Sequence, residues 1–179
     1  MKLGVSIEKP TSEDVRDIQE LYYRTWLATY PNEKAGISRD DIEDHFKDAF
    51  SPETIAKRTE RIVRPPEGET SLVARDQGKV IGLIRSTVFA DHNQINVFYV
   101  LPEYQGKGIG HALWDEIEKS LDSEKETRVH VFEYNERAID FYRKRGFKDT
   151  GERFTRPERF TFKSGAIMPE SSMIRKPTQ

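Results

Sequence analysis

The sequence contains no cysteine in its 179 residues. This absence excludes a disulfide framework, a cysteine nucleophile and cysteine-ligated zinc. No apolar run approaches the length of a membrane span, and the N-terminal segment lacks the apolar core of a signal peptide. The formal net charge is only −2 at pH 7, so no general basic field favours nucleic acid. We therefore expect a cytoplasmic protein with no metal, no membrane partner and no nucleic-acid partner.

The pattern of apolar residues indicates a single domain of mixed α/β type over residues 1–179. A chain of this length buries about 70% of its unfolded surface, which is enough for a genuine core. Helical spacing predicts helices that begin near Thr11, Ser38, Pro52, Gly110 and Asn135. Strand patterns lie at 5–9, 71–75, 80–89, 95–100 and 129–131, and three further pieces at 152–155, 159–162 and 172–175 are expected to be edge strands.

The most informative segment joins an apolar strand to a helix and reads Gln-Gly-Lys-Gly-Ile-Gly from Gln105 to Gly110. Three glycines in five positions allow a ligand to approach the backbone closely. The helix that follows directs unpaired N–H groups and the positive end of its dipole at the same point. The spacing matches neither the dinucleotide fingerprint nor the P-loop. We therefore predict a phosphate-binding loop of another kind.

A second pattern follows one strand later, from Asn135 to Phe147. Together, Gln105-x-x-Gly108-x-Gly110 and Asn-x-x-Ala-Ile-x-Phe-Tyr-x-Lys-x-Gly-Phe resemble the two motifs of the Gcn5-related N-acetyltransferase (GNAT) family, in the family's order. The resemblance implies an α+β fold whose central sheet is mixed, mainly antiparallel and splayed into a V, with helices on both faces. It also implies acetyl-CoA as co-substrate, with its pyrophosphate on the loop.

The same resemblance assigns roles to particular residues. A backbone N–H between Phe98 and Val100 would stabilise the oxyanion, and the pantetheine arm would pair with that opened strand edge. Asn135 would contact the coenzyme and also cap a helix. Tyr142 would protonate the departing thiolate. The residues expected to bind the coenzyme are Phe98, Tyr99, Val100, Gln105, Gly106, Lys107, Gly108, Ile109, Gly110, His111, Asn135 and Tyr142.

The general base is not identified by the sequence. Family members often carry a carboxylate on the strand before the loop, whereas positions 94–99 here hold Gln, Ile, Asn, Val, Phe and Tyr. An amine acceptor is mostly protonated at neutral pH, so its proton must still be removed. The candidates are Asp91, His92, Glu133, or a water molecule held by Gln94 and Asn96.

The sequence patterns indicate more than one class of acceptor. Trp26 and Tyr30 resemble a pattern seen in polyamine and small-amine acetyltransferases, which favours a small free amine and places both residues at the acceptor site. An acidic group at 40–44 could attract a cationic amine, while the basic and aromatic segment 153–163 could meet an acidic or peptide acceptor. The alternatives are a protein N-terminus or lysine as acceptor, and a coenzyme-binding sensor without catalysis. A homodimer is left open.

Overall fold

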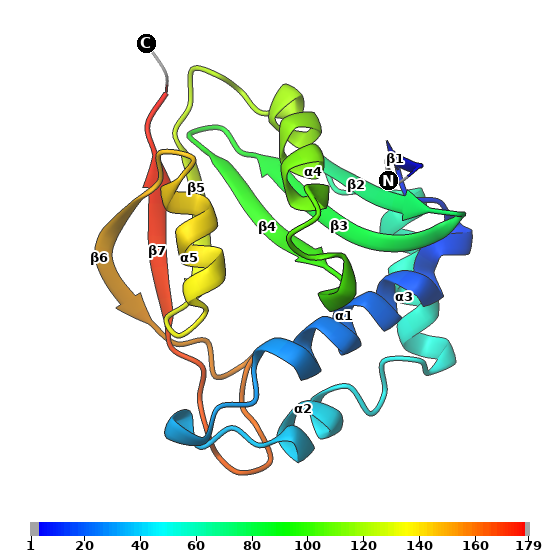
Figure 1. Cartoon of the computed structure of the whole chain (residues 1–179), viewed down its shortest axis with the longest axis vertical. Helices are drawn as coiled ribbons and strands as arrows, with labels where there is room; N and C mark the ends of the chain where they lie inside the picture. The colour runs from blue at the N-terminus through cyan, green and yellow to red at the C-terminus, as the bar shows by residue number, and fades with distance from the viewer. Residues whose placement is uncertain (1–3, 178–179) are drawn as a thin grey trace.

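The computed structural model describes residues 4–177 and arranges their strands as one seven-stranded sheet, in the order β1-β2-β3-β4-β5-β7-β6 (Figure 1). Neighbouring strands are antiparallel except β4 and β5, which are parallel. The predicted mixed, mainly antiparallel sheet is therefore confirmed. The strands are β1 (Val5–Glu8), β2 (Glu69–Asp76), β3 (Lys79–Val88), β4 (Asn93–Val100), β5 (Thr127–Phe132), β6 (Lys148–Phe154) and β7 (Glu170–Arg175).

The middle of the sheet opens between β4 and β5. These strands pair only over three residues of β4, Asn93 to Ile95, and then part. On its other side β4 carries a register shift, because Ser86 of β3 faces Ile95 whereas Arg85 faces Val97. Asn96 is the extra residue of this bulge, and a bulge increases the local twist. The strands diverge from this point, as Figure 1 shows.

Helices cover both faces of the sheet, as predicted. The side chains of successive strand residues point to opposite faces. Tyr99 of β4 contacts Tyr22 of α1 with ring centroids 5.2 Å apart, whereas its neighbour Phe98 contacts Phe141 of α5 at 4.9 Å. α1 therefore packs on one face, and α4 and α5 lie on the other. The helices are α1 (Val15–Thr29), α2 (Arg39–His45), α3 (Pro52–Val63), α4 (Ile109–Ile117) and α5 (Glu136–Arg143).

The C-terminal third differs from the sequence prediction. Residues 159–162 form no strand and make only an isolated bridge between Thr161 and Ile167. The strand that ends the chain is not at an edge, because β7 lies between β5 and β6. A second apolar cluster beside α1 and α2 instead contains the buried side chains of Phe160, Phe162 and Met168. Tertiary packing of these three side chains overrides the local strand propensity.

None of the helices within residues 4–177 combines the length and the apolar character needed to cross a membrane. The prediction of one domain over residues 1–179 stays a prediction, since residues 1–3 and 178–179 lie outside the described part of the chain.

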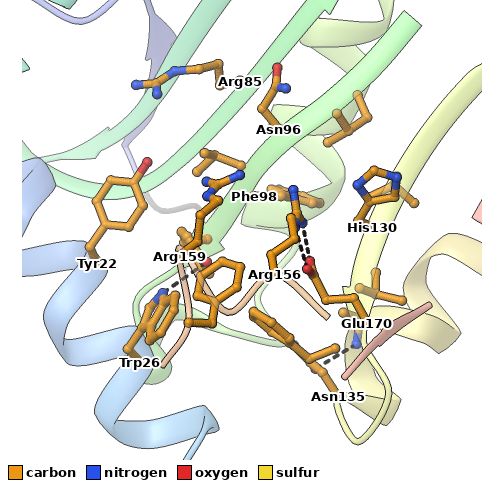
Figure 2. Close-up of a pocket in the computed structure, with 18 of the residues that line it drawn as sticks. Tyr22, Trp26, Arg85, Asn96, Phe98, His130, Asn135, Arg156, Arg159 and Glu170 are labelled. Carbon is orange, nitrogen blue, oxygen red and sulfur yellow. Dashed lines mark hydrogen bonds and ion pairs between the residues drawn. The ribbon is translucent and has the colours of Figure 1, made fainter. Parts of the chain in front are cut away.

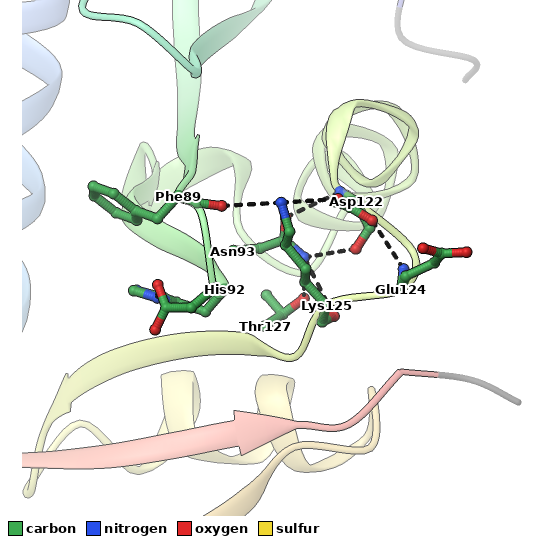
Figure 3. A network of polar contacts seen from close by, with 8 residues as sticks. Phe89, His92, Asn93, Asp122, Glu124, Lys125 and Thr127 are labelled. Carbon is green, nitrogen blue, oxygen red and sulfur yellow. Dashed lines mark hydrogen bonds and ion pairs between the residues drawn. The ribbon is translucent and has the colours of Figure 1, made fainter.

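Asn93 fixes the closed end of the V (Figure 3). Its side chain is fully buried. Its amide nitrogen donates to the carbonyl of Asp122 at 2.8 Å, and its amide oxygen accepts from the backbone N–H of Asp122 at 3.0 Å. Lys125, in the same turn, donates to the carbonyl of Phe89 at 3.1 Å. The start of β4 is thereby tied to the turn that leads into β5.

We expect Asn93→Ala to lower the free energy of unfolding by about 2–3 kcal/mol, because it removes a fully buried amide and leaves the partly buried N–H and carbonyl of Asp122 without their partner. Urea unfolding measures this loss. Glu124→Ala, in the same turn but with an exposed side chain, is the matched control and should change stability by less than about 0.5 kcal/mol. Equal effects of the two substitutions would contradict the structural role of Asn93.

Candidate active site

A cavity of about 800 Å³ occupies the gap where β4 and β5 part. Its walls come from α1, α2, α3, β3, β4, β5, α5, β7 and the segment between β6 and β7. Of the residues predicted to contact the coenzyme, Phe98, Tyr99, Asn135 and Tyr142 line it. The cavity therefore joins the open edge of β4 to the helix that carries Tyr142, as Figure 2 shows for several of its lining residues.

The open edge of β4 presents free backbone groups to this cavity. The N–H of Leu101 donates to the carbonyl of Ile81 on β3. In an antiparallel pair such bonded positions alternate, so the N–H groups of Phe98 and Val100 point away from β3 and toward the gap. Strand geometry thus directs the N–H groups of the predicted oxyanion donors into the gap.

The predicted phosphate loop lies between β4 and α4. Gly106 and Gly108 have φ values of 76° and 86°, a region that L side chains rarely adopt. Gly108 is the N-cap residue of α4, so the next three N–H groups begin the helix and lack helical partners. Gly106, Lys107 and Gly108 are exposed. The loop therefore offers its main chain to an anionic ligand.

Side chains brace this loop and add positive charge to it. Gln105 donates from its amide nitrogen to the carbonyl of Val100 at 2.8 Å, and its amide oxygen accepts from Arg137 of α5. Arg145 contacts the ring of His111 at 2.8 Å. Lys107 and Arg137 give the surroundings a positive charge suited to a pyrophosphate. The first and second sequence motifs are thereby joined through the Gln105–Arg137 contact.

Tyr142 lies on α5 with its ring buried against Phe98, Trp114 and Phe147. Burial raises the pKa of its hydroxyl well above the ordinary value of a phenol. The group therefore keeps its proton at neutral pH. Asn135 caps the same helix by accepting from the N–H of Ala138 at 3.1 Å and also lines the cavity.

The predicted carboxylate bases do not reach the cavity. Asp91 is exposed and contacts the ring nitrogen of His92 at 2.8 Å, and Glu133 pairs with Arg153 at 2.6 Å. Both positions lie at strand ends, where side chains turn toward solvent. Gln94 and Asn96 do line the cavity, and Asn96 accepts a hydrogen bond from Thr87 at 2.8 Å.

A histidine that sequence reasoning missed lies in this region. His130 of β5 lines the cavity between the buried residues Val129 and Val131. Burial lowers the pKa of its imidazole, with a further lowering from Arg156. His45 of α2 also lines the cavity, and burial lowers its pKa too. A polar residue in the middle of an apolar strand was the available signal for His130.

Aromatic side chains form the wall on the α1 side. Trp26 and Tyr30, the two residues predicted for the acceptor site, are both buried and both line the cavity. The indole nitrogen of Trp26 donates to the hydroxyl of Tyr99 at 3.0 Å, and its ring stacks on His45 at 5.0 Å. Burial raises the pKa of Tyr99 to about 12. These rings are therefore at once part of the second apolar cluster and part of the cavity wall.

Guanidinium groups dominate the charge of the cavity. Glu170 is the single carboxylate among its described lining residues, and it is held by Arg156 at 2.6 Å. The acidic group at 40–44 contributes no lining residue. Its buried member, Asp41, completes the capping box of α2 by accepting from the N–H of Ser38, and it also accepts from the N–H of Ser164. The arginines in the lining are Arg58, Arg61, Arg85, Arg156 and Arg159.

The family model of the acetyltransferase (GNAT) domain matches residues 26–158, which is more than half of the chain. The chain belongs to the GNAT acetyltransferases. This acetyltransferase therefore uses acetyl-CoA to acetylate an amine.

Similar proteins agree with this family assignment. The acetyltransferase is 28% identical to the peptidyl-lysine N-acetyltransferase YjaB of Escherichia coli over 147 residues, covering 82% of this chain and 84% of YjaB. It resembles the structure of the PaiA N-acetyltransferase of Thermoplasma acidophilum in complex with coenzyme A, with a TM-score of 0.72 and 27% identity over 97% and 99% of the two chains.

Proposed function

We propose that this acetyltransferase transfers an acetyl group directly from acetyl-CoA to a small primary amine held in the cavity. The observation that carries the proposal is a single cavity that joins Tyr142 and the open edge of β4 to the wall of Trp26 and Tyr30. The segment between β6 and β7 packs on α1 and α2 and adds Arg156, Arg159 and Phe160 to the cavity lining. The chain contains no cysteine that could carry the acetyl group, which favours direct attack by the amine.

In the proposed ternary complex, the coenzyme pyrophosphate binds the loop at 105–110 and the pantetheine arm follows β4. The thioester oxygen accepts from a backbone N–H at Phe98 or Val100, which stabilises the tetrahedral intermediate. The neutral amine forms a C–N bond to the carbonyl carbon, and the C–S bond then breaks. Tyr142 gives its proton to the sulfur, so that free coenzyme A leaves as a thiol.

We further propose His130 as the group that takes the proton from the amine. A base must be neutral to accept a proton, and burial lowers the pKa of this imidazole below its usual value of 6.5. Its neutral form therefore predominates at neutral pH. Gln94 and Asn96 line the same cavity, and a water molecule between them can pass the proton onward.

We expect His130→Gln to lower kcat/KM about 10-fold at neutral pH and to remove the acid limb of the rate profile. In the wild type that limb lies below pH 6.5, because activity falls only as the imidazole becomes protonated. Initial rates between pH 5 and 9 measure it. The control His92→Gln, outside the cavity, should keep the wild-type profile; an unchanged profile in His130→Gln would remove this residue from the mechanism.

A lysine side chain of a protein is the second candidate acceptor, favoured by the similarity to YjaB. Release of coenzyme A thiol, together with the mass of the product, distinguishes the two classes when small amines and lysine-containing peptides are compared. The proposal requires turnover with a small amine. Turnover with peptides alone would assign a protein acceptor, and coenzyme binding with no acetylated product from either class would indicate a sensor.

A further inference from the structure

The cavity holds more positive charge than its own carboxylates neutralise. Arg156 is paired with Glu170, and Arg61 and Arg85 share Glu69. Arg58 and Arg159 have no carboxylate within 4.0 Å among residues 4–177. A cavity that binds a cationic polyamine would need more carboxylates than arginines, because like charges repel across a low-dielectric site.

Arg85, another arginine of the cavity lining, is deeply buried. The side chain of Arg85 on β3 is only 7% exposed. Its Nε atom faces the hydroxyl of Ser71 at 3.0 Å and Glu69 at 3.4 Å. Arg85 is also a lining residue of the cavity, and Figure 2 shows it near Tyr22 and Asn96. Because a buried charge is costly unless it is well paired, the cavity side of this group favours an anion.

The two unpaired arginines each lie over an aromatic ring of the cavity wall. Arg58 of α3 lies over the ring of Tyr22 at 5.4 Å. Tyr22 packs against Tyr99, with centroids 5.2 Å apart. Arg159, from the segment between β6 and β7, lies over the ring of Phe160 at 5.3 Å, and Phe160 packs against Trp26, whose indole nitrogen donates to the hydroxyl of Tyr99. Tyr99 in turn adjoins Phe98, whose N–H faces the reacting position.

The phosphates of coenzyme A do not account for this charge. The loop at 105–110 lies at the start of α4 and has its own cations, Lys107 and Arg137. α4 lies on the face of the sheet opposite α1, whereas Arg58 contacts a residue of α1. The excess positive charge is therefore on the acceptor side of the cavity.

We infer that the acceptor is a small amine that also carries an anionic oxygen group, a carboxylate or a phosphate, held by Arg58, Arg85 and Arg159. This inference rests on the proposed function and names the acceptor class for the same cavity. Guanidinium groups bind such anions by charge-assisted hydrogen bonds, which are the strong ones. With the anion bound there, the amine of the same molecule is directed toward the open edge of β4.

Calorimetric titration of the protein saturated with coenzyme A tests the inference without relying on turnover. In the carboxylate series, amino acids with a terminal amine and three to five carbons are compared with the alkylamine and the diamine of equal length. In the phosphate series, 2-aminoethyl phosphate is compared with ethanolamine. We expect the anionic ligands to bind at least about 10-fold more tightly. The carboxylate and phosphate series show which anion fits. Equal or tighter binding of the diamines would overturn the inference.

The double variant Arg58→Gln, Arg159→Gln should erase most of that preference. Arg64→Gln removes one charge from an exposed arginine that caps α3 outside the cavity, and it should keep the preference. Thermal melts confirm that each variant is folded. Preference retained in the double variant would overturn the anion site. If the anionic amines bind preferentially but acetyl-CoA yields no acetylated product, the proposed transfer to these amines is overturned. If product forms but the anionic amines bind no more tightly than the others, the inference alone is overturned.

Discussion

Replacing Gly108 by valine is expected to raise the dissociation constant of acetyl-CoA about 100-fold, with the fold retained. The φ value of this residue is 86°, and a Cβ at this position would meet no protein atom within 4 Å. The damage therefore comes from the backbone conformation and from the space that the ligand needs, since a β-branched residue strains strongly at positive φ. Calorimetric titration with acetyl-CoA measures the loss.

Gly78→Val is a closely matched control for this experiment. Gly78 lies in the hairpin between β2 and β3, its φ is 83°, and a Cβ there would also meet nothing within 4 Å. Both variants should lose about 1–3 kcal/mol of stability from backbone strain, while only Gly108→Val should lose affinity for the coenzyme. Wild-type affinity in a folded Gly108→Val protein would contradict the phosphate loop.

Tyr142→Phe is expected to reduce kcat about 100-fold, with little change in acetyl-CoA binding or stability. The substitution keeps the ring that packs against Phe98 and Trp114 and deletes only the hydroxyl. A thiol such as that of coenzyme A ionises near pH 8.5, so the thiolate can leave without help and the loss stays moderate. Single-turnover kinetics measure it under conditions in which chemistry limits the rate.

The pH dependence adds a second check on Tyr142. Burial raises the pKa of its hydroxyl well above the ordinary value, so the group stays protonated across the working range. The variant should therefore be slower at every pH while the shape of the profile is unchanged. Tyr23→Phe, on α1 outside the cavity, should keep the wild-type rate. A wild-type rate in Tyr142→Phe would mean that water protonates the sulfur.

Local sequence patterns predicted the backbone conformations on the proposed coenzyme side of the site, whereas they carried little information on the proposed acceptor side. Gly106 and Gly108 act through backbone conformation, and Asn135 acts as a cap, so each leaves a local signature at fixed spacing. The open edge at Phe98 followed from the resemblance. Helix and strand bounds were mostly correct within a few residues, because the apolar periodicity of each element is set by residues that are close in sequence.

The acceptor side depends on residues that are distant in sequence. Arg58, Arg85 and Arg159 come from a helix, a strand and an irregular segment, and only the tertiary fold brings them to one cavity. The segment around Phe160 resembles a strand locally but is held by α1 and α2 instead. Asp41 looked available to attract a cation, yet the fold uses it as a buried cap. No local pattern distinguishes these outcomes.

The short pairing between β4 and β5 also has a thermodynamic consequence. β4 and β5 are joined by backbone pairing over only three residues of each strand. The two halves of the sheet, β1–β4 and β5–β7, are therefore held together mainly by side-chain packing and by the contacts of Asn93. A coenzyme arm that pairs along β4 and also contacts α5 would bridge the halves. By mass action, a ligand at 100 times its dissociation constant adds about 2.7 kcal/mol to the free energy of unfolding. The lifetime of this protein against proteolysis should then follow the supply of coenzyme A, so the co-substrate would govern how much enzyme persists as well as how fast it works.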